Sequence, residues 1–178
     1  MRAKPLLIVG LALLGLLAGG WFGQRHYAPR MPTPSATDQV WQLAYPDAGG
    51  QTQALSQWRG QILVLNFWAS WCAPCREEMP DFAALRRQYH DQGVEFVGIA
   101  VDNAANVAQF LANAPVNYPI LIGEGAAQAA ARQLGNTSGA LPYTVVFDRQ
   151  GQAVVRHLGR LPRASLETTL ATLLTEAR

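Results

Sequence analysis

Residues 62–75 have the sequence ILVLNFWASWCAPC, an almost unbroken apolar run that ends in two cysteines. The β-forming run at 62–68 predicts a strand that is covered on both faces, as central strands of a sheet are. Pro74 suits the first turn of a helix, because the backbone N–H that proline lacks has no helical partner there. The stretch therefore predicts a central strand, a short loop and the start of a helix, with the cysteines at the junction.

The segments on either side extend this pattern into an α/β domain. Residues 74–90 place apolar side chains at helical spacing, and Gly93 ends this predicted helix. A second apolar run at 94–101 predicts a strand, and strand, helix and strand within about 40 residues form a βαβ unit with parallel strands. We expect a central mixed β-sheet flanked by helices, with a central insertion. The remaining predicted elements are an N-terminal hairpin within 39–58, helices at 103–114, 125–134 and 163–177, and strands at 118–122, 143–147 and 153–158.

Residues 1–27 have the pattern of an export signal or a membrane anchor. An uncharged and mostly apolar run of 17 residues, 6–22, follows two basic residues. This length is short for a membrane-spanning helix and long for the apolar part of a cleaved signal. No convincing small-x-small cleavage site precedes the domain, and Trp21 and Tyr27 stand where interfacial aromatic residues are common. We favour an uncleaved single anchor, with cleavage as the open alternative, and expect the domain outside the cytoplasm.

The composition of the rest of the chain restricts its partners. Residues 28–37 contain three prolines and predict an extended linker, which places the globular domain at 38–178. Four of the 14 basic residues and none of the 12 acidic ones precede residue 38, so the domain has a formal net charge of −2. Its arginines are scattered, which argues against nucleic acid as a partner. Lys4 is the only lysine, so the domain has no Schiff-base lysine and no lysine-containing phosphate loop.

The only two cysteines, Cys72 and Cys75, stand at the first turn of the predicted helix. Unpaired backbone N–H groups and the helix dipole favour a thiolate there, so the pKa of Cys72 should lie below that of a free thiol. A thiolate is the nucleophile of disulfide exchange. Cys75, one helical turn further on, can attack the resulting mixed disulfide and leave the two cysteines joined. The pair is therefore a candidate for two-electron exchange.

Other uses of two cysteines fit less well. A purely structural disulfide would close a very short loop, where the stabilisation from loop entropy is smallest. Zinc needs about four ligands, and His26, His90 and His157 are not paired at ligand spacing. Covalent haem attachment needs a histidine where Arg76 stands. A copper(I) site on two thiolates stays open as a second class of function. We expect no metal ion or cofactor for the redox reaction itself.

Two segments resemble a known family. Residues 66–80, NFWASWCAPCREEMP, resemble the active-site segment of the TlpA and ResA type thiol-disulfide oxidoreductases, which are membrane-tethered members of the thioredoxin superfamily. Residues 139–148, GALPYTVVFD, are similar to the second signature of that family, a loop and strand with a cis-proline beside the cysteines. The resemblance covers residues 38–178 and implies a thioredoxin-like fold.

The resemblance also assigns roles to residues. It implies that Cys72 attacks the client disulfide, that Cys75 resolves it, and that the two form the redox-active disulfide. It implies that Pro142 is a cis-proline; from the residues alone, an ordinary proline at a strand edge is equally plausible. We expect Trp71 to pack over the disulfide, with a place in the core as the alternative. The expected client-binding residues are Trp71, Ala73, Pro74 and Leu141.

Glu78 matches a glutamate that lies near the cysteines in ResA-like proteins and influences their protonation. The alternative is a solvated helix carboxylate close to the positive helix N-terminus. Asn66 stands where thioredoxin has a buried aspartate that helps to deprotonate the resolving thiol. Proton exchange with Cys75 therefore needs another group or water, and Glu78 is the carboxylate that the motif offers.

By resemblance, the protein is expected to be a protein-disulfide reductase on the periplasmic side of the bacterial inner membrane. Client disulfides there form by default, so a tethered dithiol is most useful as a local reductant. The implied partners are cysteine-containing proteins of cytochrome c maturation or copper delivery, and a membrane electron donor of the DsbD or CcdA type. Oxidising or isomerising exchange and a Cu(I)-binding chaperone stay as alternatives, and a peroxiredoxin is a remote one. A monomer is the expected state.

Overall fold

The computed structural model describes Trp21 and residues 36–176. Apart from Trp21, the predicted anchor at 1–27 lies outside these residues. No helix within the described part of the chain has the length and apolar character needed to cross a membrane. The helical elements are α2 (Ala36–Val40), η1 (Leu55–Trp58), α3 (Ala73–Tyr89), η2 (His90–Gln92), α4 (Ala104–Asn113), α5 (Glu124–Gln133) and α6 (Arg163–Glu176). The strands are β1 (Ala44–Pro46), β2 (Thr52–Ala54), β3 (Ile62–Trp68), β4 (Val94–Ala100), β5 (Ile120–Ile122), β6 (Tyr143–Phe147) and β7 (Ala153–Leu158).

The central sheet has five strands in the order β5-β4-β3-β6-β7. Strands β3, β4 and β5 are parallel, whereas β6 and β7 run antiparallel to their neighbours, so the predicted mixed sheet is confirmed. Every residue of β3, β4 and β6 is buried, as their continuous apolar sequences predict. The register places Asn66 of β3 between Gly98 of β4 and Thr144 of β6.

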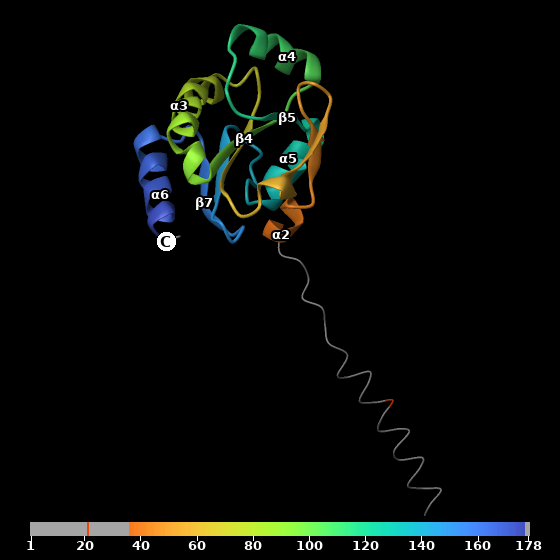
Figure 1. Ribbon diagram of the computed structural model, residues 1–178. Coiled ribbons are helices and arrows are strands. Elements are labelled where there is room, and N and C mark those ends of the chain that lie inside the picture. The colour runs from red at the N-terminus through yellow and green to blue at the C-terminus, as the bar shows by residue number, and fades with distance from the viewer. Residues whose placement is uncertain (1–20, 22–35, 177–178) are drawn as a thin grey trace, which may run out of the picture. The chain divides into compact units, whose positions relative to one another are not determined.

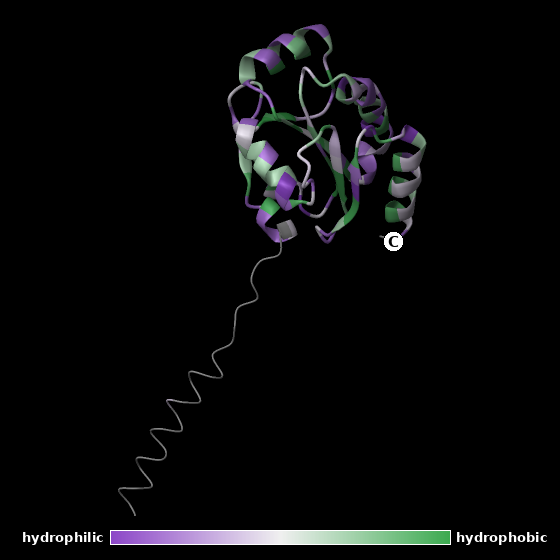
Figure 2. Ribbon diagram, turned by 180° about the vertical axis from the view of Figure 1, so that it is seen from behind, coloured by the Kyte–Doolittle hydropathy of each residue, from purple (hydrophilic) through white to green (hydrophobic). Residues whose placement is uncertain are grey.

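Helices cover both faces of this sheet (Figure 1). Residues of α3, α4 and α6 form one hydrophobic cluster with β3 side chains such as Val64 and Trp68. Residues of α2, η1 and α5 form the other cluster with the alternate side chains of β3, among them Leu65 and Phe67. Figure 2 shows the strands as the most hydrophobic ribbons and the helices as mixed, as expected for a two-sided core.

The elements agree with the sequence-based prediction except near the start of the domain. The two-stranded hairpin is shorter than the predicted 39–58, because α2 and η1 flank it. Helix α2 also includes Ala36 and Thr37, which the prediction assigned to the linker. A helix of five residues is marginal alone. It is held by the burial of Val40 and by the adjacent Trp41, whose indole N–H donates to the carbonyl of Gly151 at 3.2 Å.

Candidate active site

The two cysteines form a disulfide at the N-terminus of α3. The S–S distance is 2.01 Å and the Cα atoms lie 5.3 Å apart. Cys72 is the N-cap residue, and its Sγ accepts a hydrogen bond from the backbone N–H of Cys75 at 3.4 Å. The sulfur of Cys72 thus lies against the free N–H groups of the helix, where negative charge is stabilised. This position can hold Cys72 as a thiolate once the disulfide is reduced.

The two cysteines differ in their access to solvent. Cys72 is 5% exposed and Cys75 is fully buried. Trp71 is 67% exposed, so its alternative place in the core is wrong. Ala73 and Pro74 are also exposed and border the disulfide. A client can therefore approach Cys72 across an exposed surface that consists of Trp71, Ala73 and Pro74, while Cys75 is shielded.

The loop before β6 lies beside this surface. Strand β6 is antiparallel to β3 and pairs Tyr143 with Phe67, so the start of β6 lies at the edge of the sheet where β3 ends and the cysteine loop begins. The Leu141-Pro142 bond is cis, as the resemblance implied. Leu141 is partly buried, and the carbonyl of Pro142 accepts a 2.8 Å hydrogen bond from Gly159.

Glu78 is fully buried beneath the cysteines, so the solvated alternative is wrong. Its Oε1 accepts a 2.8 Å hydrogen bond from the Asn66 side-chain amide, and its Oε2 accepts a 3.0 Å bond from the backbone N–H of Leu161. The same Asn66 amide nitrogen donates to the hydroxyl of Thr144 at 3.0 Å. The buried carboxyl is thus held by groups from β3 and from the loop before α6, and Thr144 of β6 extends the network.

Burial controls the protonation of Glu78. Loss of solvation raises its pKa from 4.5 to about 7, although the hydrogen bonds from Leu161 and Asn66 and the positive charge of Arg160 act in the opposite direction. The charge of Asp81 adds a small upward contribution. The carboxyl can therefore exchange a proton near neutral pH, which an exposed glutamate does not do.

Glu78 and Cys75 lie on the same face of α3. They are three residues apart in the helix, and both are fully buried against the sheet. The buried sulfur and the buried carboxyl are therefore neighbours, one helical turn apart. The first turns of α3 thus carry Cys72, Cys75 and Glu78, the residues to which the resemblance assigns the roles of nucleophile, resolving thiol and proton acceptor.

The sequence analysis missed Asp102, which supports the loop before Cys72. Its carboxylate accepts hydrogen bonds from the backbone N–H and the hydroxyl of Ser70, from the backbone N–H of Asn103 and from the side chain of Asn106. Burial raises the pKa of Asp102, but these four bonds lower it more, so the net shift is downward. The position of Asp102 directly after a buried strand was an available signal, since functional groups gather at the carboxyl ends of parallel strands.

The histidines considered as metal ligands take part in other contacts. Nδ1 of His90 lies 3.4 Å from a carboxylate oxygen of Glu95, and Nε2 of His157 lies 3.1 Å from the carbonyl oxygen of Arg160. His26 is outside the described residues. Within residues 36–176, no group of three or more His, Cys, Asp or Glu side chains is placed to hold a metal ion.

Comparisons with known proteins agree with this geometry. The Redoxin family model matches residues 29–173. The chain is 27% identical to the thiol-disulfide oxidoreductase ResA of Halalkalibacterium halodurans over 99% of this chain and 96% of the relative. It is 30% identical to ResA of Geobacillus kaustophilus over 71% of each chain.

Solved structures give the same fold. A thioredoxin-related protein of Neisseria meningitidis serogroup B has a TM-score of 0.66 and 31% identity, over 75% of this chain and 99% of that one. A thiol:disulfide interchange protein of Chlorobium tepidum has a TM-score of 0.67 and 24% identity, over 81% and 97%. The chain therefore belongs to the redoxin family and is a thiol-disulfide oxidoreductase of the ResA type with a thioredoxin-like fold.

Proposed function

We propose that the protein is a reductant of disulfides in other extracytoplasmic proteins and works from the bacterial inner membrane, held there by residues 1–27. The main support is the difference between the two cysteines: Cys72 keeps 5% of its surface exposed at a helix N-terminus, and Cys75 is fully buried one helical turn from a carboxyl whose pKa is raised to about 7. This arrangement suits a nucleophile that meets the client and a second thiol that acts only afterwards.

In the first step, the Cys72 thiolate attacks one sulfur of the client disulfide. The client S–S bond breaks, a mixed disulfide with Cys72 forms, and the released client thiolate takes up a proton from solvent. The backbone beside Pro142, at Leu141, pairs with the client chain, while Trp71, Ala73 and Pro74 form the surface that the client covers. These roles follow the family resemblance and agree with the exposure of the last three side chains.

In the second step, Cys75 attacks the sulfur of Cys72 and the second client thiol leaves. Glu78 takes the proton of Cys75 as this attack begins and returns it to the leaving thiolate. Asn66 fits both states of Glu78, because an amide offers a donor to a carboxylate and, after rotation, an acceptor to a carboxylic acid. The hydroxyl of Thr144 can likewise accept from or donate to that amide. Two electrons and two protons reach the client, and the Cys72–Cys75 disulfide is the product.

The expected partners follow from the proposed direction of electron flow, from this protein to its clients. The oxidised protein needs a membrane electron donor of the DsbD or CcdA type to reduce its disulfide again. The clients are cysteine-pair proteins of cytochrome c maturation or copper delivery. The proline-rich linker predicted before α2 gives the catalytic domain, which begins with that helix at Ala36, reach from the membrane surface toward both.

The reduction potential of the full-length protein in detergent tests the direction of electron flow. Equilibration against dithiothreitol or glutathione buffers should give about −230 mV or lower for a reductant. A value of about −120 to −180 mV would mean that the protein oxidises or isomerises disulfides instead. Exchange with a disulfide substrate should be lost in Cys72→Ser, whereas tight Cu(I) binding with slow exchange would point to a copper chaperone.

The role of Glu78 has its own test. The rate of the second step should lose its titration near pH 7 in Glu78→Gln and keep it in Glu77→Gln, which changes the exposed neighbouring carboxylate. An unchanged pH profile in Glu78→Gln would remove Glu78 from the proton transfer.

A further inference from the structure

Three unsatisfied polar atoms lie in the core beneath α3. In the described residues, four buried side-chain atoms have no hydrogen-bond partner: Asn66 Oδ1, Trp68 Nε1, Tyr118 Oη and Arg149 Nε. Trp68 and Tyr118 belong to the cluster on the α3 side of the sheet, and Asn66 binds Glu78 on that same side. Three of the four atoms therefore share the core that holds the buried carboxyl.

The backbone leaves room for these groups at one position of β4. Asn66 and Trp68 are two residues apart in β3 and so point to the same face of the sheet. Gly98 is the β4 partner of Asn66. A Cβ atom at Gly98 would lie 3.0 Å from Trp68 Nε1 and 2.7 Å from a methyl carbon of Ile120. Because glycine has no side chain, the indole nitrogen of Trp68 can lie over β4 at Gly98, the residue that the register pairs with Asn66.

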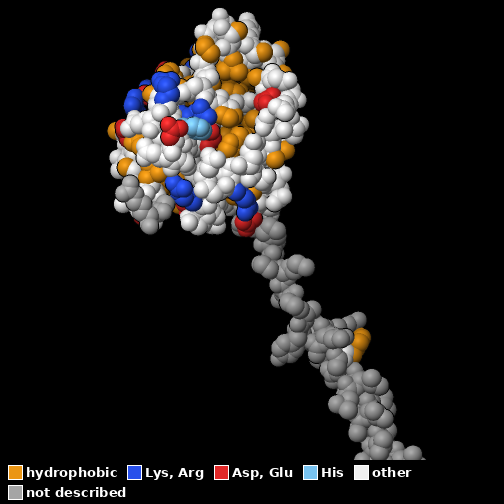
Figure 3. Space-filling view, in the orientation of Figure 1, with side chains coloured by type: hydrophobic (Ala, Val, Ile, Leu, Met, Phe, Trp, Pro, Cys, Tyr) orange, Lys and Arg blue, Asp and Glu red, His pale blue; other side chains and the backbone are white. Residues whose placement is uncertain are grey.

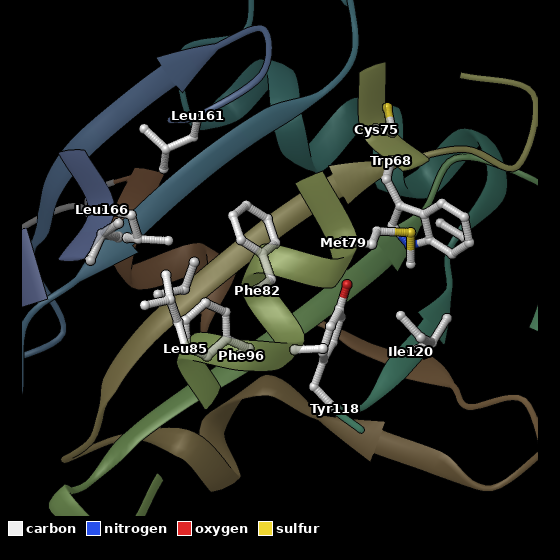
Figure 4. Packing of buried hydrophobic residues seen from close by; sticks show 14 of the residues in the cluster. Trp68, Cys75, Met79, Phe82, Leu85, Phe96, Tyr118, Ile120, Leu161 and Leu166 are labelled. Carbon is white, nitrogen blue, oxygen red and sulfur yellow. The ribbon is translucent and has the colours of Figure 1, made fainter. Parts of the chain in front are cut away.

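Tyr118 enters the same region from the segment before β5. Figure 4 shows its hydroxyl pointing away from the backbone, toward Met79 and Phe82 of α3. Burial raises the pKa of Tyr118 far above its usual range, and the negative charge of Glu78 raises it further. Met79 follows Glu78 directly in α3, so the phenol hydroxyl points toward the helical turn that carries the buried carboxyl, although no direct hydrogen bond joins the two side chains.

Buried donors and acceptors are rarely left without a partner, and internal water commonly supplies one where several polar groups meet. We propose that this polar pocket, formed by Asn66, Trp68, Glu78 and Tyr118, binds internal water that links the Tyr118 hydroxyl to the Glu78 carboxyl. Tyr118 is then a positioning residue: its O–H donates toward the carboxylate through water and favours the ionised form of Glu78.

Tyr118 also reaches the surface of the domain. One side of its ring lines a groove of about 410 Å³ between α4 and the β1–β2 turn, together with Asp47, Leu111 and Ile120. Figure 3 shows hydrophobic side chains gathered on this face of the domain, below α4. Tyr118 thus belongs both to the lining of this groove and to the core beneath α3.

The other groups that affect the pKa of Glu78 do so without involving Tyr118. The Leu161 N–H binds Oε2 directly, and Arg160 and Asp81 act from partly exposed positions. Asn66 binds Oε1. Tyr118 therefore supplies a contribution that a change at Tyr118 alone should remove.

The test is a pH titration of the Glu78 side-chain carboxyl carbon by NMR in the oxidised full-length protein, in which the cysteines do not titrate. Tyr118→Phe should raise the pKa of Glu78 by about one unit, because a hydrogen bond to the ionised form is lost. The control is Tyr89→Phe, which removes a hydroxyl that donates to Glu167 at 3.4 Å, away from the polar pocket. It should leave the titration unchanged. No shift in Tyr118→Phe, or a downward one, overturns the proposal.

A crystal structure of the wild-type protein gives a second test that needs no variant. Ordered water within hydrogen-bond distance of both Tyr118 Oη and Glu78 is expected, and a dry pocket overturns the proposal. The inference concerns the ionisation of Glu78, whereas its role in exchange rests on the proposed function. If Glu78→Gln keeps the wild-type pH profile of exchange while Tyr118→Phe shifts the Glu78 titration, the proposed proton transfer fails and the water link stands.

Discussion

Replacing Glu78 with glutamine should stabilise the oxidised protein above pH 7 and change its stability little near pH 4. The folded protein raises the pKa of this carboxyl from 4.5 to about 7. Between these values the folded state binds the Glu78 proton more tightly than the unfolded state does. The contribution of Glu78 to stability is therefore full below about pH 4.5, falls as the pH rises toward 7, and is constant above that.

The size of the effect follows from the shift. One pKa unit corresponds to about 1.4 kcal/mol, so a rise of about 2.5 units costs the wild-type protein about 3 kcal/mol of unfolding free energy between pH 4 and pH 8. Glutamine does not titrate and loses none of this. Its oxygen can accept the Leu161 N–H while its amide donates to Asn66 Oδ1 after that side chain rotates, so the buried network stays satisfied.

Urea unfolding at several pH values between 4 and 8.5 measures the difference directly. The gap between Glu78→Gln and wild type should widen by about 3 kcal/mol over this range. In Glu77→Gln the gap should stay nearly constant, because that carboxylate is 60% exposed and its ion pair is with the half-exposed Arg160. A constant gap in Glu78→Gln would refute the reasoning, since it would mean that Glu78 titrates in the folded protein as it does in the unfolded chain.

Two further substitutions test the packing around the site. Gly98→Ala forces a methyl group into van der Waals overlap and should cost about 1 to 3 kcal/mol in urea unfolding, whereas Gly125→Ala, with no atom within 4 Å of its added Cβ, should stay within about 0.5 kcal/mol of wild type. Arg86→Ala leaves the buried Glu95 without its bidentate partner and should cost about 3 kcal/mol, far more than Arg87→Ala at the exposed neighbouring position. Equal losses within either pair would contradict the packing described.

The sequence was sufficient for the parts of the fold that depend on local pattern. Strands at 62–68 and 94–101 were predictable because central strands are apolar throughout, and the place of the cysteines was predictable because one strand, loop and helix carries them both. Glu78 was identified by the family resemblance. The burial of Glu78 also had a signal: Cys75 and Phe82 lie about one turn before and one turn after it on the same helix face.

The partners of Glu78 were not predictable from local pattern. Leu161 and Thr144 are 83 and 78 residues from the groups that they bind, and nothing near them in the sequence marks them as polar partners. Thr144 meets Asn66 only because the β3–β6 register pairs them, and Leu161 meets Glu78 only through the loop that follows β7. Tyr118 was not predictable either, because nothing in the sequence around it indicates that its hydroxyl is buried.

The unequal exposure of Cys72 and Cys75 gives the cycle a fixed order of covalent events. In the proposed reaction a large partner forms its bond with Cys72, because Cys75 has no exposed surface, and attack by Cys75 is the step that releases the partner in its reduced form. Cys75→Ser should therefore arrest the cycle with the partner still covalently attached. The variant would act as a bait that retains its natural clients through denaturing purification and releases them when a reducing agent is added.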